Sequence, residues 1–443
     1  MCGIFAIFSP RETTSTIAKT IEGLKLLQHR GRDGCGIAYS RKSLMEIEHA
    51  VYKGLGSVKD VFEGFENKRS SICIGHTRYS TSGSSMSSMI KHNELQPINK
   101  TIDGAAITIV HNGNIPNSRY HDTTMLLDML VASQDDIEAT LVKMLNKIPV
   151  AYSLIIMYNE TLYIVRDRFG IRPLSVAYYE DGDICISSET RPMEACRNIR
   201  EVGSGEIIRI DKTNISSIYS HPQAVSGLCL FEILYFMNPR SLVYGNSVEF
   251  HRKRLGRMLG QKEKNIPRNS TNFVVVGVPD SGIIAARAYC DQMNLTYIQL
   301  IKKTVQCENG EDRTFILPSQ TIRERECRKK FKFSAESIQD MNIVVIDDTI
   351  VRGTVITTII QSLRHFGARS VHIRIPAPPI VDKCELGIAI QSREELLLYN
   401  RTQEQARIQI GADSLGYLEL GDLSIFPVTS YAGYFGRHID YKA

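Results

Sequence analysis

The sequence predicts two domains of different classes: a layered α+β domain, then an α/β domain with a mostly parallel sheet. Three observations support this prediction. The chain has 443 residues, long for one hydrophobic core and sufficient for two. Its first half contains short β-branched segments broken by Gly, Ser and Asn. Its second half instead repeats a continuous apolar run followed by a helical segment.

In the first half, segments typical of strands are residues 72–75, 106–110, 152–157 and 162–165. Helices are expected around 14–27 and 123–145. Because the strands form one group and the helices another, the pattern favours a layered α+β arrangement.

In the second half, apolar strands are expected at 273–278, 342–346 and 371–375, with helices at 283–290 and 355–366. Strands that are apolar on both faces and alternate with helices are typical of a parallel sheet. We place the domain boundary in 222–227, which gives domains of residues 2–225 and 226–443.

Composition excludes several classes of protein. The formal net charge is only +5, and the densest basic stretch, 323–332, has interleaved glutamates. Such a stretch is typical of a solvated helical face, so no nucleic-acid partner is predicted. The longest apolar runs, such as 343–346, are too short to cross a bilayer, so no membrane partner is predicted.

The first residues lack the basic stretch and apolar core of a signal peptide, so a cytoplasmic location is expected. The ten cysteines are then free thiols, catalytic groups or metal ligands rather than a disulfide framework. A zinc ribbon is excluded because the sequence contains no CxxC pair.

Cys2 directly follows Met1. Removal of Met1, which is favoured when residue 2 is small, would leave a thiol beside its own α-amino group. That amine titrates at about pH 8 and can act as the base for the sulfur. Many chains begin with Met-Cys for no catalytic reason, so this pair alone is a weak signal.

Three further motifs follow Cys2 in order, at 28–33 (Gln-His-Arg-Gly-Arg-Asp), 75–81 (Gly-His-Thr-Arg-Tyr-Ser-Thr) and 111–114 (His-Asn-Gly-Asn). Together they resemble the N-terminal nucleophile (Ntn) glutaminase domains of class II glutamine amidotransferases, from residue 2 to about 220. The resemblance implies an Ntn hydrolase-like sandwich in which Cys2 attacks the side-chain amide of glutamine. It also implies an oxyanion hole formed by Asn112 and Gly113, whose donors stabilise developing negative charge.

The resemblance further implies a glutamine-binding set: Arg30, His76, Arg78 and Asp122. In this set Arg78 pairs with the α-carboxylate of glutamine, which suits a bidentate guanidinium, and Asp122 pairs with the α-amino group. Asp122 lies only eight positions after Asn114, where the family usually has a full helix. A helix-capping aspartate ahead of 123–130 is therefore the alternative reading. Two later matches, 166–174 and 187–190, are interpreted as structural.

Residues 344–354 combine an apolar strand, the carboxylates of Asp347 and Asp348, a Gly/Thr loop and a helix start. Backbone N–H groups at a helix N-terminus bind anions, and adjacent acids can hold ribose hydroxyls directly or through Mg²⁺. Response regulators and Walker B sites also have acidic strand ends. The chain, however, contains no Gly-Lys-Ser/Thr loop to accompany a Walker B strand.

The motif resembles the phosphoribosyl pyrophosphate (PRPP) signature of type I phosphoribosyltransferases. The resemblance implies Mg²⁺ bound at Asp347 and Asp348. It also implies a PRPP-binding set: Asp280, Ser281, Lys302, Arg313, Asp347, Asp348, Thr349, Val351, Arg352, Gly353 and Thr354. Residues 277–282 match the pyrophosphate loop, with Gly282 where many relatives have serine. Residues 313–320 match the lid, but 304–312 is longer than usual and lacks the family's Asn-Arg-Tyr, so altered lid closure is expected.

Some relatives ligate an iron–sulfur cluster with cysteines at positions like Cys229 and Cys384, and these relatives also need a C-terminal CxxC. Here the tail reads Ser-Tyr-Ala-Gly at 430–433. Since two of four thiolates are missing, we predict no iron–sulfur cluster.

The order of the two halves resembles the amidophosphoribosyltransferase family, which converts PRPP, glutamine and water to 5-phosphoribosylamine, glutamate and pyrophosphate in the first step of purine synthesis. The resemblance implies a homo-oligomer, commonly a tetramer, and purine nucleotide effectors. An enzyme that hydrolyses glutamine but transfers ammonia poorly remains an alternative. A PRPP-sensing regulator is disfavoured because the glutaminase motifs are intact and no helix-turn-helix precedes the second domain. Glucosamine-phosphate synthase is excluded, since its isomerase half would lack the Asp-Asp-Thr of 347–349.

Overall fold

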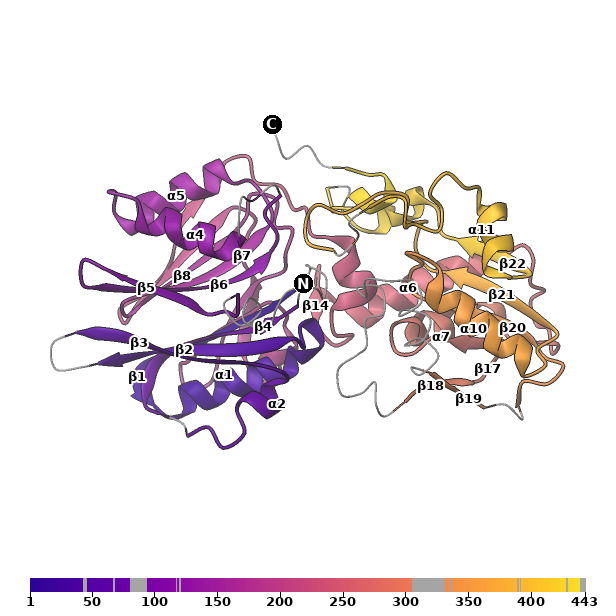
Figure 1. Cartoon of the computed structure of the whole chain (residues 1–443), viewed down its shortest axis with the longest axis horizontal. Coiled ribbons are helices and arrows are strands. Elements are labelled where there is room, and N and C mark those ends of the chain that lie inside the picture. The colour runs from indigo at the N-terminus through magenta and orange to yellow at the C-terminus, as the bar shows by residue number, and fades with distance from the viewer. Residues whose placement is uncertain are drawn as a thin grey trace.

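The structure is a computed structural model. It describes residues 1–42, 46–66, 68–79, 94–116, 118, 121–304, 331–334, 337–388, 390, 392–427 and 429–438. Two halves lie side by side, and the N-terminus lies between them (Figure 1). The N-terminal half contains antiparallel sheets and the C-terminal half a parallel sheet, so the predicted fold class is confirmed.

The N-terminal half is built on two antiparallel sheets. The first has the strand order β11-β9-β10-β1-β4-β2-β3. Its strands are β1 Gly3–Thr13, β2 Gly34–Lys42, β3 Ile47–Leu55, β4 Ser70–Arg78, β9 Ser175–Tyr178, β10 Ile184–Ser187 and β11 Arg197–Glu201. The second has the order β13-β12-β8-β7-β6-β5. Its strands are β5 Ile98–Ile102, β6 Ala105–Gly113, β7 Tyr152–Tyr158, β8 Thr161–Arg166, β12 Glu206–Ile210 and β13 Ile215–Ser220.

These sheets and their helices form four layers, because successive side chains of a strand point to opposite faces. Along β1, Ile4 and Ala6 join a core shared by the two sheets, whereas Phe5 and Ile7 join a core with α1 (Ser15–Leu26) and α2 (Val58–Val61). The second sheet packs its other face against α4 (Asp122–Val131) and α5 (Ile137–Lys147).

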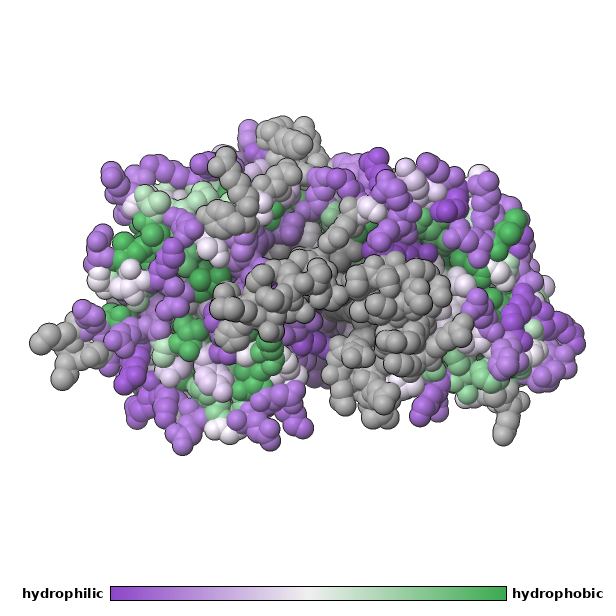
Figure 2. All heavy atoms as spheres, viewed as in Figure 1, coloured by the Kyte–Doolittle hydropathy of each residue, from purple (hydrophilic) through white to green (hydrophobic). Residues whose placement is uncertain are grey.

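The C-terminal half contains a parallel sheet of order β17-β16-β20-β21-β22. Its strands are β16 Phe273–Gly277, β17 Thr296–Tyr297, β20 Asn342–Ile346, β21 Ser370–Ile375 and β22 Ser414–Tyr417. The helices around it are α6 Val248–Gln261, α7 Ser281–Met293, α10 Thr354–His365 and α11 Gln403–Ile410. Small antiparallel pairs lie beside it: β14 Leu242–Val243 with β15 Asn246–Ser247, and β18 Ile301–Lys303 with β19 Phe331–Phe333. On the face drawn in Figure 2, hydrophilic side chains cover much of both halves.

One predicted helix is wrong in its extent. The segment 123–145 forms two helices, because Asp136 caps the second one: its side chain accepts from the N–H of Ala139 at 2.9 Å. Most of the basic stretch, 323–330, lies outside the described residues. Among the helices of the described residues, none is long and apolar enough to span a membrane.

The chain passes from the antiparallel sheets to the parallel sheet between β13 and a one-turn π-helix, η3 (Glu232–Phe236). The boundary predicted near residue 225 lies in this stretch and stays a prediction. The C-terminal tail returns here, since the N–H of Leu230 donates to the carbonyl oxygen of Tyr431 at 3.0 Å. The segment around Tyr431 therefore packs against the junction of the halves.

Candidate active sites

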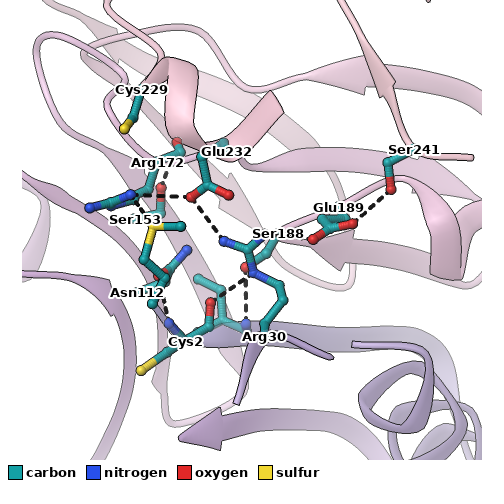
Figure 3. A network of polar contacts seen from close by, with 12 residues as sticks. Cys2, Arg30, Asn112, Ser153, Arg172, Ser188, Glu189, Cys229, Glu232 and Ser241 are labelled. Carbon is teal, nitrogen blue, oxygen red and sulfur yellow. Dashed lines mark hydrogen bonds and ion pairs between the residues drawn. The ribbon is translucent and has the colours of Figure 1, made fainter. Parts of the chain in front are cut away.

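Cys2 lies at the start of β1, next to the ends of β4 and β6. The register of β1 with β4 pairs Gly3 with Thr77. The backbone N–H of Cys2 donates to Oδ1 of Asn112 at 3.1 Å, and its thiol donates to the carbonyl oxygen of Tyr79 at 3.8 Å. Two of the motifs predicted to act together therefore meet at Cys2, one through Tyr79 and the other through Asn112. Figure 3 shows the contact of Cys2 with Asn112.

Asn112 contacts Cys2, and Gly113 follows it as the last residue of β6. Asn112 is fully buried, and among the described residues its Nδ2 has no hydrogen-bond partner. A buried amide donor without an acceptor is costly, which favours a ligand that supplies one. At Gly113 a Cβ would lie 2.0 Å from the carbonyl oxygen of Ala151, so only glycine fits. The arrangement can stabilise an oxyanion formed when Cys2 attacks a carbonyl carbon.

Charged and titratable side chains gather near the end of β4. Arg78 forms an ion pair with Glu94, and Oδ1 of Asp122 lies 3.7 Å from Nδ1 of His111. Burial opposes the ionisation of Asp122, but the His111 and His121 imidazoles and the N–H of Thr123 together outweigh it and lower the pKa of Asp122 below its ordinary value. Burial lowers the pKa of His121, which also feels the charges of Asp122, Glu94 and Arg78. The guanidinium of Arg78 and the carboxylate of Asp122 therefore both lie near enough to His121 to affect its charge.

Asp122 fits both roles considered for it. As the first residue of α4, it accepts from the N–H of Thr123 at 2.8 Å and of Ile115 at 3.4 Å, as helix-terminal acids do. The same carboxylate lies, with Arg78, among the charged groups around His121. The geometry leaves both readings open.

The other two residues of the predicted glutamine-binding set are buried. Arg30, in η1 (Gln28–Arg30), donates from Nε to the carbonyl oxygen of Cys2 at 2.9 Å. Its remaining nitrogens pair with Glu189 and Glu232 (Figure 3). His76 is 1% exposed, and burial holds its pKa well below the ordinary value, so its imidazole is neutral.

The second candidate site lies where β20 ends and α10 begins. Gly353 has a φ of +85°, in the left-handed region that favours glycine, and it turns the chain into α10. Asp347 and Asp348 are buried, and the hydroxyl of Thr349 donates to Oδ2 of Asp348 at 2.7 Å. Burial raises the pKa of Asp348, and hydrogen bonds from Ser281 and Thr349 oppose that rise.

The loop after β16 packs against this motif. A Cβ at Gly282 would lie 2.5 Å from the carbonyl oxygen of Ile346 and 3.1 Å from Cα of Asp347. A side chain larger than that of glycine would therefore displace this backbone. Because Gly282 at the start of α7 packs against Ile346 and Asp347, α7 meets the 347–353 loop at the carboxyl edge of the sheet, the usual place for a ligand in this fold class.

The basic residues near this edge are only partly those expected. Lys303 lies 2.8 Å from Oδ2 of Asp280, whereas Lys302, its neighbour on β18, is exposed. Arg352 forms an ion pair with Glu395. The carbonyl oxygen of Val351 accepts from the N–H of residue 397 at 2.9 Å. Arg313 and the lid of 313–320 lie outside the described residues, as does 305–312.

Two tyrosines of the C-terminal segment lie beside Cys229 and Cys384. The thiol of Cys229 lies 3.8 Å from the hydroxyl of Tyr434, and that of Cys384 lies 3.7 Å from the hydroxyl of Tyr431. Burial raises the pKa of the Cys229 thiol to about 12. A neutral thiol beside a phenol is a poor donor set for iron and sulfide, which are held by four thiolates.

Sequence reasoning missed three residues that the structure brings to these sites. Glu94 forms an ion pair with Arg78, and Glu232 forms one with Arg30. Asp280 forms its ion pair with Lys303 rather than with Lys302. Glu232 alone had a usable signal, since it is a lone acid within the apolar segment 229–236. Adjacent lysines on a strand point to opposite faces, but the sequence does not say which face meets the loop.

Comparison with known proteins gives one family. A family model described as a glutamine amidotransferase domain matches residues 84–195. An amidophosphoribosyltransferase of Pyrococcus horikoshii is 35% identical over 94% of this chain and 91% of its own length. The amidophosphoribosyltransferase of Methanocaldococcus jannaschii is also 35% identical, over 96% of this chain and 93% of its own.

Two solved structures are similar to this chain over nearly its whole length. The glutamine PRPP amidotransferase of B. subtilis, complexed with ADP and GMP, matches with a TM-score of 0.81 and 30% identity, covering 99% of this chain and 94% of that one. A structure described as the allosteric regulatory enzyme of purine biosynthesis matches with a TM-score of 0.82 and 30% identity, covering 95% and 90%.

Proposed function

Because the chain belongs to the amidophosphoribosyltransferase family, we propose how its own residues carry out the family reaction. The enzyme transfers the amide nitrogen of glutamine to PRPP, giving 5-phosphoribosylamine, glutamate and pyrophosphate, the first step of purine synthesis. The proposal assigns glutamine hydrolysis to residues 2–225 and transfer to residues 226–443.

Cys2 is the proposed nucleophile. Its thiolate attacks the side-chain carbonyl carbon of glutamine, the C–N bond breaks, and ammonia leaves from a thioester that water then hydrolyses to glutamate. When Cys2 is the first residue of the mature chain, its α-amino group takes the thiol proton and returns it to the leaving nitrogen. The contact of the Cys2 nitrogen with Oδ1 of Asn112, at 3.1 Å, would orient that amine.

The proposed oxyanion hole consists of Nδ2 of Asn112 and the N–H of Gly113. Glutamine is held with its α-carboxylate on Arg78, which it takes from Glu94, and its α-amino group on Asp122. The lowered pKa of Asp122 supports this role, since a carboxylate rather than a carboxylic acid attracts the ammonium group. Behind the substrate, the buried His76 and Arg30 hold the strand ends in place.

PRPP binds, in this proposal, at the carboxyl edge of the parallel sheet. Backbone N–H groups of 349–354 and the N-terminus of α10 receive the 5-phosphate. Asp347 and Asp348 hold the ribose hydroxyls. The pyrophosphate contacts Asp280, Ser281 and the lysines of β18, including Lys302, with Arg313 of the lid completing the set. Ammonia attacks C1 of the ribose, and the C1–O bond to pyrophosphate breaks as C1–N forms.

Mg²⁺ is the proposed cofactor. It prefers oxygen ligands and is typically held by one or two carboxylates together with substrate phosphates. Asp347 and Asp348 offer carboxylates at a strand end. Among the described residues no cluster of three or more His, Cys, Asp or Glu side chains could hold a metal without substrate. When bound with PRPP, Mg²⁺ would neutralise charge on the departing pyrophosphate. For the thiols and phenols around Cys229, we propose that no iron–sulfur cluster binds.

Regulation and assembly are proposed from the family. The B. subtilis relative is described in complex with ADP and GMP, which supports purine nucleotides as effectors of this chain. A homo-oligomer, commonly a tetramer, and a cytoplasmic location complete the proposal. The location is supported by eight described cysteines that form no disulfide.

The unpaired Nδ2 of Asn112 beside Cys2 is the observation that carries the proposal. The test measures PRPP-dependent release of glutamate and pyrophosphate by wild type, Cys2→Ala and Asp347→Ala. Wild type should couple the two products, Cys2→Ala should keep only ammonia-driven pyrophosphate release, and Asp347→Ala should lose pyrophosphate release from both nitrogen sources. Glutamate release without PRPP, and no pyrophosphate, would instead indicate a glutaminase that does not transfer.

A further inference from the structure

A buried network of ion pairs joins the two halves beside Cys2 (Figure 3). This junction network consists of Arg30, Arg172, Glu189 and Glu232, and all four side chains are 0% exposed. Three of them belong to the N-terminal half, and Glu232 comes from η3 in the C-terminal half. Buried charges are tolerated only when they are paired, so removal of one partner leaves its neighbour uncompensated.

Glu232 is one side chain away from the backbone of Cys2. Arg30 donates from Nε to the carbonyl oxygen of Cys2 at 2.9 Å and from Nη2 to Oε1 of Glu232, also at 2.9 Å. Burial opposes the charge on Arg30, but Glu232 and Glu189 together raise its pKa above the ordinary value. Arg30 is therefore a permanent cation whose position depends on both carboxylates.

The two carboxylate oxygens of Glu232 differ in their hydrogen bonding. Its Oε1 also accepts from Nη1 of Arg172 at 3.3 Å, so two guanidinium groups share one oxygen. Its other oxygen, Oε2, is buried and has no hydrogen-bond partner among the residues that the structure describes. A displacement of η3 would move the oxygen that Arg30 and Arg172 share. Either arginine could then transfer its hydrogen bond to Oε2, because that oxygen has no partner among the described residues.

Hydrogen bonds join η3 and the residues just after it to both halves. The N–H of Asn238 and the hydroxyl of Ser241, just after η3, donate to Oε2 of Glu189 at 2.8 Å each. From the other side, buried Arg252 of α6 donates to the carbonyl oxygens of residues 233 and 237 at 2.8 and 2.9 Å. π-Helical turns are rare and frequently occur at functional sites. A shift of α6 is therefore transmitted to η3 and from there to Glu232.

We propose that Glu232 is a positioning residue for glutamine hydrolysis, supplied to the glutaminase site by the C-terminal half. Through Arg30 it fixes the backbone of Cys2, and hence the thiol, relative to Asn112. This inference rests on the proposed role of Cys2 as the nucleophile. The glutaminase site is then incomplete without η3.

The test compares glutamine and ammonia as nitrogen sources. Wild type, Glu232→Gln, Glu232→Asp and the control Glu263→Gln are assayed for pyrophosphate release with each source. Glu263 is a matched control because it forms an equally buried ion pair, with Arg374, in which the side chains are 2% and 3% exposed. The rate of Cys2 alkylation by iodoacetamide, followed by mass spectrometry, reports the position of the thiol directly.

For Glu232→Gln we expect kcat with glutamine to fall on the order of 10²-fold, as for a misplaced reacting group. The KM for glutamine, the ammonia-driven rate and the glutamine-to-ammonia ratio of Glu263→Gln should stay near wild type. Cys2 alkylation should slow together with kcat. Glu232→Asp keeps the charge and should therefore show a smaller fall in kcat with glutamine than Glu232→Gln. If Glu232→Gln does not fold, Glu232→Asp alone should show a fall in kcat with glutamine and an ammonia-driven rate near wild type.

An equal loss with both nitrogen sources, an equal fall in the ratio for Glu263→Gln, or no loss in either Glu232 variant would overturn the inference. Cys2→Ala, measured in parallel, separates this result from the proposed function. If Cys2→Ala still hydrolyses glutamine, the role of Cys2 is wrong and the inference falls with it. If Cys2→Ala is inactive and Glu232→Gln hydrolyses glutamine normally, only the inference is wrong.

Discussion

The two candidate sites are held together by contacts of different range along the chain. Around Cys2 the contacts join residues 2, 30, 112 and 232, and the last of these belongs to the other half. In the PRPP loop (residues 347–353, the proposed PRPP site) the contacts stay within the C-terminal half, as those of Thr349 with Asp348 and of Arg352 with Glu395 do, and the helix start follows directly at Thr354. A site assembled from distant segments responds to changes far from it, whereas a contiguous loop depends mainly on its own backbone and on the loop packed against it.

The largest expected effect tests the assembled site. In Gly113→Ala, the added Cβ would meet the carbonyl oxygen of Ala151 at 2.0 Å, so β6 and β7 must separate and the proposed oxyanion donor moves. We expect glutamine hydrolysis to fall on the order of 10³-fold. Ammonia-driven pyrophosphate release should persist, because the PRPP loop makes none of these contacts. A comparable loss with both nitrogen sources would show that the sites are not separable.

The next effect tests the contiguous loop. In Gly282→Ala, the Cβ would meet the carbonyl oxygen of Ile346 at 2.5 Å and push the start of α7 away from Asp347. We expect kcat/KM for PRPP to fall on the order of 10²-fold with both glutamine and ammonia, since about 1 Å of misplacement suffices for such a loss. Asp291→Ala, an exposed acid on the same helix, serves as the control. A loss seen with glutamine alone would contradict the assignment of this loop to PRPP.

A smaller effect concerns competition for Arg78. Glu94 pairs with Arg78 in the absence of substrate, so glutamine must displace it. Glu94→Gln should lower the KM for glutamine severalfold, corresponding to about 0.5–1 kcal/mol for a partly exposed ion pair. Initial rates against glutamine concentration measure this directly. A raised KM would mean that Glu94 helps to bind the substrate instead.

The smallest expected effect is an absence of pH dependence. The pKa of Asp122 lies below its ordinary value, so its carboxylate stays ionised as the pH falls from neutral through the ordinary range of aspartate. The KM for glutamine should therefore stay flat between about pH 7.5 and pH 5.5, where an unperturbed aspartate, with a pKa of about 3.9, is also ionised. A KM that rises within that window, with the rise absent in Asp122→Asn, would mean that the pKa of Asp122 is raised.

Much of the fold was predictable because strand and helix periods are local. The strand at 342–346 has the predicted bounds, and α10 begins one residue before the predicted 355. The break between α4 and α5 was missed because a capping aspartate, Asp136, lies within an otherwise helical pattern. The order of the sheets follows from pairings between distant strands, which a single sequence does not reveal.

It was easier to predict which residues belong to a site than which of them contact each other. Motif order brought Cys2, Arg78 and Asn112 into one set, and the structure places the Cys2 nitrogen against Asn112. That Arg30 pairs with Glu232 could not be predicted, because the contact depends on how the two halves pack. The same limit applies to Lys303, whose contact with Asp280 depends on the face that β18 turns toward the loop.

The most direct test of the central claim, that one chain passes ammonia from Cys2 to PRPP, is an isotope competition. The enzyme is given PRPP and glutamine labelled with ¹⁵N in its amide, together with unlabelled ammonium at a concentration at which Cys2→Ala forms little product. The amine product is captured as a stable acylated derivative. If transfer is internal, the product should carry ¹⁵N at nearly the enrichment of the glutamine amide, and glutamate and pyrophosphate should appear in equal amounts. A product diluted to the enrichment of the surrounding ammonium would contradict the account, because ammonia would then leave the first site before reaching the second.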